Sequence, residues 1–129
     1  MALSPVNPAG GGWPGVSMAV IDRQRGVLVS TGHVGTGPDG APVTTSVEAQ
    51  VVALFENLKL TLAAAGLNFS HVARMTNYIK SYDPEFMATF REVRLRYFNP
   101  ACLPASVMVQ AGLYDERLLV EAEVIAIVP

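Results

Sequence analysis

Residues 120–127 of the chain read Val-Glu-Ala-Glu-Val-Ile-Ala-Ile, and the alternation in this stretch decides the fold around it. The apolar residues at every second position are Val120, Ala122, Val124 and Ala126. Because neighbouring side chains of a strand point to opposite faces, the pattern predicts a strand with one buried face. The other face carries Glu121, Glu123, Ile125 and Ile127. We therefore expect at least one of the two carboxylates to lie on a partly apolar surface.

The first third of the chain predicts an arm, a hairpin and a loop. Residues 1–15 are rich in proline and glycine, which predicts an irregular N-terminal arm. Two apolar runs at residues 16–21 and 26–31 flank the polar segment Asp22-Arg23-Gln24-Arg25, a pattern typical of two strands joined by a turn. The glycines and prolines between residues 32 and 42 predict a loop.

The middle of the chain predicts two helices with a strand between them. Ser46 offers an N-cap, apolar residues recur at helical spacing after it, and Gly66 offers a C-cap. Residues 72–79 have the composition of a strand. Asp83-Pro84-Glu85 then supplies an N-cap, a first-turn proline and an acid that the helix dipole favours. Asn99-Pro100 ends this second helix.

The last third of the chain predicts two closing strands, at residues 106–111 and 118–127, on either side of a turn at residues 112–116. The predicted order of elements is ββαβαββ. We expect residues 1–129 to form a single domain, because no linker or repeat interrupts them and this length can bury a sizeable core.

Composition argues against several classes of protein. The net charge is −2 and no run of Lys and Arg occurs, which argues against nucleic acid as a partner. No apolar run reaches the roughly 18 residues of a membrane-spanning helix, and residues 1–15 do not resemble a secretory signal. We therefore expect a cytoplasmic protein. Cys102 is the single cysteine and has no second thiol or histidine cluster beside it, so we expect no metal or other cofactor.

Five pieces of the sequence stand in the order seen in one known family. They are Ser30-Thr31-Gly32, residues 55–59 with 64–67, residues 72–79, Pro104-Ala105 and residues 120–127. Through them the chain resembles the RidA family, also called the YjgF family, of small trimeric imine and enamine deaminases. The resemblance covers nearly the whole chain. It implies an α+β fold with a mixed sheet packed against two helices, and a homotrimer in which three sheets form a chorismate-mutase-like barrel.

The resemblance also implies ligand clefts between neighbouring subunits. In catalytic members an arginine directly after Pro-Ala grips the substrate carboxylate, and the first glutamate of the last strand orders the attacking water. Here Ser106 follows Pro104-Ala105, Glu121 is the matching glutamate, and Val16 stands where deaminating members have a tyrosine. Serine cannot copy the bidentate fork of arginine, so binding of a 2-imino acid in the usual way should be strongly weakened. The backbone amide of Met108 remains a candidate donor to a ligand.

Other candidate binding residues lie on the loop after the second strand and on the second helix. Thr31 and Gly32 end a strand where the family contacts its ligand. His33 follows them and could transfer a proton near neutral pH, although a loop histidine without a role is the simpler interpretation. Arg91 and Arg94 share a helix face and could supply a compensating cationic site, whereas most such pairs are solvated surface. The complete set of binding candidates is Thr31, Gly32, His33, Arg91, Ser106 and Met108.

Glu121 is the candidate for chemistry, because a carboxyl group among apolar neighbours has a raised pKa suited to water activation. The alternative is a structural glutamate paired with a neighbouring subunit, and this is the preferred interpretation for Glu123. Two functions remain open at this point. One is a deaminase-like hydrolase acting on a small imine, enamine or related metabolite, with Glu121 orienting water. The other is a non-catalytic trimer that binds a small metabolite.

Overall fold

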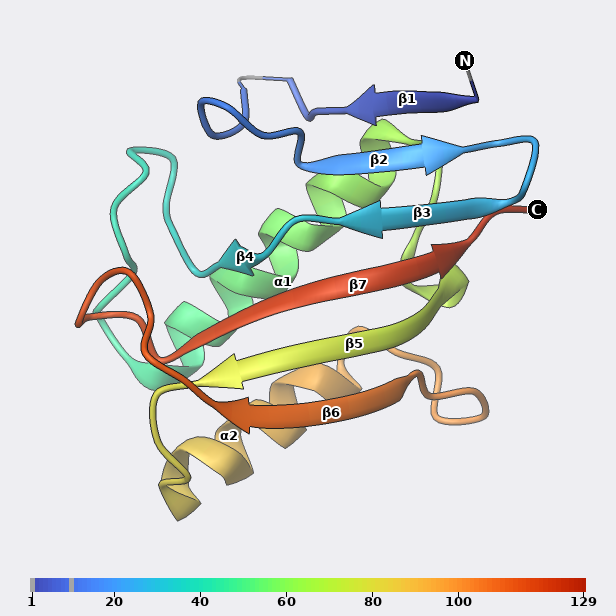
Figure 1. Cartoon of the computed structure of the whole chain (residues 1–129). Coiled ribbons are helices and arrows are strands. Elements are labelled where there is room, and N and C mark those ends of the chain that lie inside the picture. Colours follow the sequence, from blue (N-terminus) through green and yellow to red (C-terminus); the bar gives the residue numbers. More distant parts are fainter. Residues whose placement is uncertain (1, 10) are drawn as a thin grey trace.

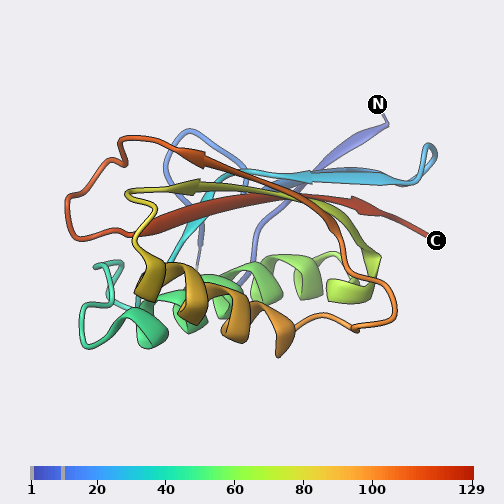
Figure 2. The same cartoon turned by 90° about the horizontal axis from the view of Figure 1, so that it is seen from below.

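A computed structural model describes residues 2–9 and 11–129, which form one mixed sheet covered on one face by helices (Figures 1 and 2). The strands are β1 (Leu3–Val6), β2 (Ala19–Asp22), β3 (Val27–Ser30), β4 (His33–Val34), β5 (Val72–Ile79), β6 (Ala105–Gln110) and β7 (Val120–Ile127). The helices are α1 (Val47–Ala64) and α2 (Pro84–Leu95), with a short 3₁₀ turn at Phe69–His71. No helix in these residues is long and apolar enough to cross a membrane.

The order of strands in the sheet is β1-β2-β3-β7-β5-β6, and the short strand β4 also pairs with β7. Only β5 and β6 run parallel among the strand pairs of the described residues, and α2 makes the crossover between them. Figure 2 shows both helices on the same side of the sheet. The α+β fold with a mixed sheet and two helices is therefore confirmed, with the opposite face of the sheet left uncovered in the single chain.

The predicted alternation of residues 120–127 is confirmed in β7, the strand that joins the two halves of the sheet. The side chains that face the helices are at most 2% exposed, and they are Val120, Ala122, Val124 and Ala126. On the uncovered face Glu121 and Glu123 are half-buried and Ile125 and Ile127 are exposed. One strand thus supplies the core on one face and two carboxylates on the other.

The two helices begin where their capping residues predict. The Ser46 hydroxyl accepts a hydrogen bond from the Ala49 amide at 3.0 Å, and the Asp83 carboxylate accepts one from the Phe86 amide at 3.1 Å. Gly66 follows α1 with φ +76°, a conformation that favours glycine and ends the helix. The facing sides of α1 and α2 meet in an aromatic cluster in which the rings of Phe55 and Phe90 are centred 6.0 Å apart.

The N-terminal arm and the loop after β3 differ from the prediction, because each contains a short strand. Residues 3–6 form β1, which pairs antiparallel with the edge of β2 and buries Val6. An edge strand tolerates Pro5. Because the run is short and contains this proline, the sequence pattern does not predict the strand. His33–Val34 form β4 against β7. The prediction of residues 16–21 as the next strand began too early, since β2 spans Ala19–Asp22.

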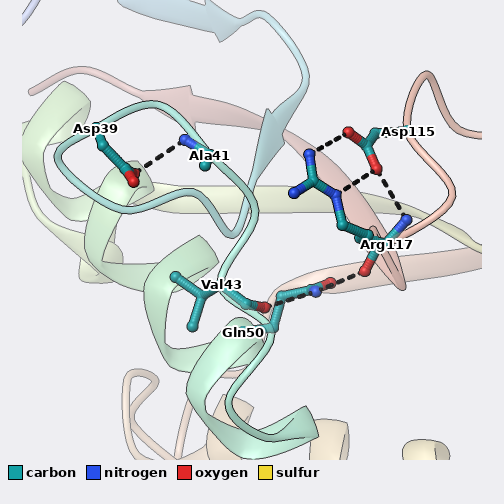
Figure 3. A network of polar contacts seen from close by, with 6 residues as sticks. All are labelled: Asp39, Ala41, Val43, Gln50, Asp115 and Arg117. Carbon is teal, nitrogen blue, oxygen red and sulfur yellow. Dashed lines mark hydrogen bonds and ion pairs between the residues drawn. The ribbon is translucent and has the colours of Figure 1, made fainter.

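Gln50 fixes the loops that surround one end of β7 (Figure 3). Its buried side-chain amide donates to the carbonyl oxygens of Val43 and Arg117, both at 2.9 Å. Its Oε1 accepts from the Leu119 amide at 2.7 Å. One side chain on α1 thereby satisfies three backbone groups from two loops that are far apart in the sequence.

Replacing Gln50 with methionine, which has a similar shape but no amide, should leave all three backbone groups without their partner. We expect the free energy of unfolding to fall by about 3 kcal/mol, because each buried unsatisfied group costs about 1–3 kcal/mol. Urea denaturation at fixed protein concentration measures the change. Gln24→Met, at an exposed position in the β2–β3 turn, is the matched control, and equal losses in the two variants would contradict the role of Gln50.

Candidate functional site

Glu121 lies on the uncovered face of the sheet, between two neighbouring strands. It is opposite Val34 of β4 on one side and opposite Tyr78 of β5 on the other. The carboxylate is half-buried there and takes part in none of the ion pairs found among the described residues. Burial raises the pKa of Glu121 above its usual value, and the nearby Glu123 carboxylate raises it further. The group is therefore suited to accepting a proton.

Gly32 is required next to Glu121 because the carboxylate rests against its backbone. A Cβ atom at position 32 would overlap Oε2 of Glu121 and would lie 2.8 Å from its Cδ. Real side chains do not approach this closely, so any larger residue would displace the carboxylate. Gly32, which follows β3, thus packs directly against the Glu121 side chain of β7.

Glu123 is held by Tyr78, whose hydroxyl donates a short hydrogen bond to Oε1 of the glutamate. This hydrogen bond to Glu123 raises the pKa of the Tyr78 phenol, and burial adds to the shift. The phenol therefore stays neutral at physiological pH. Tyr78 of β5 is directly opposite Glu121 of β7 and diagonal to Glu123 on the same face of the sheet. The positions of the three side chains therefore follow from the register of this strand pair.

A pocket of about 290 Å³ surrounds these groups. Among its lining residues are Gly32, Tyr78, Leu113, Tyr114, Glu121 and Glu123. Tyr114, from the loop before β7, packs edge-to-face on Trp13 of the N-terminal segment with ring centres 5.4 Å apart. Burial raises the pKa of Tyr114, and the acids Asp115 and Glu121 add to the shift. The pocket thus combines two carboxylates with two neutral phenols.

His33 is buried on the helix side of the sheet, away from Glu121. Its Nδ1 lies 2.9 Å from the Thr31 carbonyl oxygen and its Nε2 lies 2.8 Å from the Thr61 hydroxyl. Burial lowers the pKa of His33, so the imidazole is neutral at physiological pH. The interpretation of His33 as a loop histidine is wrong, because β4 carries it into the space between the sheet and α1.

Ser106 and Met108 lie on β6, at the edge of the sheet and two strands away from Glu121. The Asn77 amide donates to the Ser106 hydroxyl and to the Val107 carbonyl oxygen, both at 3.0 Å. The carbonyl oxygen of Met108 accepts from the Tyr82 hydroxyl at 3.1 Å. Within one chain these two residues are therefore separate from the pocket around Glu121.

The arginine pair of α2 also lies apart from Glu121, because α2 covers the opposite face of the sheet (Figure 2). Arg91 is exposed, and Arg94 is half-buried with its guanidinium carbon 5.3 Å from the centre of the Phe90 ring. Burial lowers the pKa of Arg94, and Arg91 beside it adds to this effect. The chain itself therefore brings together Gly32 and Glu121 but not Arg91, Ser106 or Met108.

Comparison with known proteins identifies the group to which the fold and the site belong. The sequence profile of the family described as Endoribonuclease L-PSP matches residues 16–128. The chain therefore belongs to this family, whose members include proteins called Rid or YjgF. The predicted resemblance is thereby confirmed.

Individual relatives agree with this assignment. Protein DfrA of Myxococcus xanthus is 41% identical over 85 residues, which cover 66% of this chain but only 63% of DfrA. TdcF of Escherichia coli K12, called a putative reactive intermediate deaminase, is 27% identical over 103 residues and 78% of each chain. The crystal structure of YyfA from Yersinia pestis, a Rid-family protein of unknown function, is 25% identical with a TM-score of 0.85. That match covers 98% of this chain and 100% of YyfA.

The raised pKa of Glu121 has a consequence for stability. A carboxyl group with a higher pKa in the folded state destabilises the fold when ionised, and this penalty disappears as the pH falls below the unfolded-state value. We expect Glu121→Gln to raise the melting temperature relative to the parent more at neutral pH than at about pH 4. Glu85→Gln, on the exposed first turn of α2, is the control for general charge effects. If the difference in melting temperature between Glu121→Gln and the parent did not change with pH, the raised pKa of Glu121 would be refuted.

Proposed function

We propose that the protein is a deaminase-like hydrolase of a small imine or enamine, in which Glu121 orients the attacking water. The observation that carries this proposal is the Glu121 carboxylate itself, which is half-buried in a pocket, raised in pKa and free of ion pairs among the described residues. A base with a pKa moved toward neutrality can accept a proton from water as the water attacks. The glutamate also stands where catalytic members of the family have theirs.

The relatives support this type of chemistry. TdcF is named as a putative reactive intermediate deaminase, and a crystal structure of TdcF contains bound serine. The family description instead names an endoribonuclease. Two carboxylates in the pocket would repel a phosphodiester, and the net charge of the chain is −2, so we favour hydrolysis of an imine over cleavage of RNA.

The proposed reaction uses one water molecule for each imine. The water oxygen bonds to the imine carbon while Glu121 accepts one of its protons. That proton is then passed to the nitrogen, which gives a carbinolamine. The remaining proton of the new hydroxyl group moves to the nitrogen as the carbon–nitrogen bond breaks, so that ammonia leaves and a carbonyl product remains. An enamine would first take a proton on carbon to become the imine. Glu121 is returned to its starting state at the end of the cycle.

A neighbouring copy of the chain would complete the cleft. The face of the sheet that carries Glu121 also exposes a group of apolar side chains, which are Val29, Val107, Val109, Ile125 and Ile127. Such a group on an uncovered face is typical of a buried subunit contact. Assembly through this face, as in the trimers of the family, would bring Ser106 and Met108 on the β6 edge of one subunit toward the Glu121 pocket of another.

A non-catalytic metabolite-binding protein is the second candidate. It is favoured by one observation, the serine at position 106, which removes the arginine that holds the substrate carboxylate in catalytic relatives. The two candidates share the pocket and differ only in turnover.

Hydrolysis is tested by measuring ammonia release from 2-imino acids and from enamines that lack a carboxylate. We expect turnover of the second group, and a decrease of at least about 100-fold in kcat for Glu121→Gln, as is usual when a general base is removed. Glu85→Gln should keep the parent rate. Undiminished turnover by Glu121→Gln would exclude the proposed role, and no turnover of either group would leave the binding protein as the function.

Assembly is tested by placing a charge on the uncovered face. Ile125 is 38% exposed in the single chain, and Ile125→Glu should shift the protein from trimer to monomer because a buried carboxylate without a partner is strongly unfavourable. Light scattering coupled to gel filtration measures the mass. Leu95→Glu, at a 52% exposed position at the end of α2, should leave the trimer intact. A parent protein that runs as a monomer would disprove the proposed cleft.

A further inference from the structure

The charged residues that line the Glu121 pocket are all of one sign. Glu121 and Glu123 line it together, and neither takes part in an ion pair in residues 2–9 and 11–129. The two tyrosines that line it have raised pKa values and so remain neutral. A ligand that enters the pocket therefore meets negative charge without a compensating cation from the walls that one chain supplies.

The basic residues near the rim of the pocket are engaged elsewhere. Arg117 forms an ion pair with Asp115, with Nη2 at 2.8 Å from Oδ2, and the same arginine donates through Nε to Oδ1 at 3.1 Å (Figure 3). Lys80 donates from Nζ to the Glu116 carbonyl oxygen at 2.7 Å. Neither side chain is directed to the carboxylates of the pocket by these contacts.

Arg74 is on the same face of the sheet but lies too far along β5. It lines a neighbouring hollow of about 210 Å³ with Glu123 and Ile125. It precedes Tyr78 by four residues, which in a strand corresponds to about 13 Å between the two Cα atoms. Arg74 could hold the far end of an extended ligand, but a small carboxylate beside Glu121 would be beyond its reach.

Two aromatic rings form part of the remaining walls of the site. Tyr78 is fixed by its hydrogen bond to Glu123, and Tyr114 is fixed by its edge-to-face contact with Trp13. The faces of such rings attract cations, and their area accommodates an apolar or aromatic group. Rings and carboxylates together make a site that suits a positively charged nitrogen attached to an apolar body.

We infer that this pocket selects a small amine or iminium cation with an apolar or aromatic body and rejects carboxylates. The inference rests on the proposed function because it concerns the same pocket. It narrows the proposed substrate to imines without a carboxylate group. A protonated imine carries the charge that the pocket favours, and its carbon is the atom that water attacks. The serine at position 106 then fits the ligand, since an arginine there would repel it.

Binding of three single-ring probes that differ in charge tests the inference without any need for turnover. The probes are benzylamine, benzyl alcohol and benzoate, and their Kd values are measured by calorimetry at neutral pH and low salt with the full chain in its native oligomeric state. We expect benzylamine to bind at least about tenfold more tightly than benzoate, with benzyl alcohol between them. Glu121→Gln and Glu123→Gln should each weaken benzylamine binding at least about threefold, while Glu85→Gln leaves it unchanged.

The outcomes separate this inference from the proposed function. Equal affinity for the three probes would overturn it, as would a preference for benzylamine that persists in both pocket variants. Preference for benzylamine without hydrolysis of any imine would support the selectivity and remove the hydrolase proposal. Hydrolysis of 2-imino acids by a protein that binds benzoate better than benzylamine would support the hydrolase proposal and overturn the selectivity for cations. Melting temperatures of the two variants confirm that each is folded, and either variant alone is sufficient for the test.

Discussion

The two-residue period of β7 is the constraint on which the rest of the structure depends. Its small side chains Ala122 and Ala126 are fully buried and let the helices pack close to the sheet. The same period sends Glu121 and Glu123 to the opposite face, where no helix covers them. A shift of one residue in the register of β7 would bury both carboxylates and expose the core residues. Core and candidate site are therefore set by one strand and cannot vary independently.

The surrounding loops depend on a second constraint, the buried amide of Gln50. It holds the segment before α1 and the segment before β7 by hydrogen bonds to their backbones. The latter segment carries Tyr114, and its Asp115–Arg117 pair lies next to the bonded carbonyl (Figure 3). The aromatic wall of the pocket is thus positioned from the helix side of the sheet, although the pocket opens on the other.

The elements that could be predicted from the sequence are those with a long periodic segment or a clear capping residue. Examples are α1 after Ser46 and the eight-residue strands β5 and β7. β1 could not be predicted because Pro5 interrupts its four residues, and β4 because two residues are too few to show a period. Glu121 was recognisable as a candidate from its place in the strand and from the family resemblance. The partner of Glu123 was not, because Tyr78 lies 45 residues away and only the register of β5 and β7 makes them neighbours.

The glycines that flank β4 have a consequence for protein engineering. A side chain at Gly32 would overlap Glu121, and one at Gly35 would overlap the backbone carbonyl of Gln50 on α1. Substitution of Gly32 would therefore disturb the candidate site, and substitution of Gly35 would force the backbone after β4 away from α1. Gly40, two residues before Pro42, has open space around its Cα, although its φ of +80° favours glycine or asparagine. Diversity is therefore better introduced as inserted residues at the tip of the loop that contains Gly40.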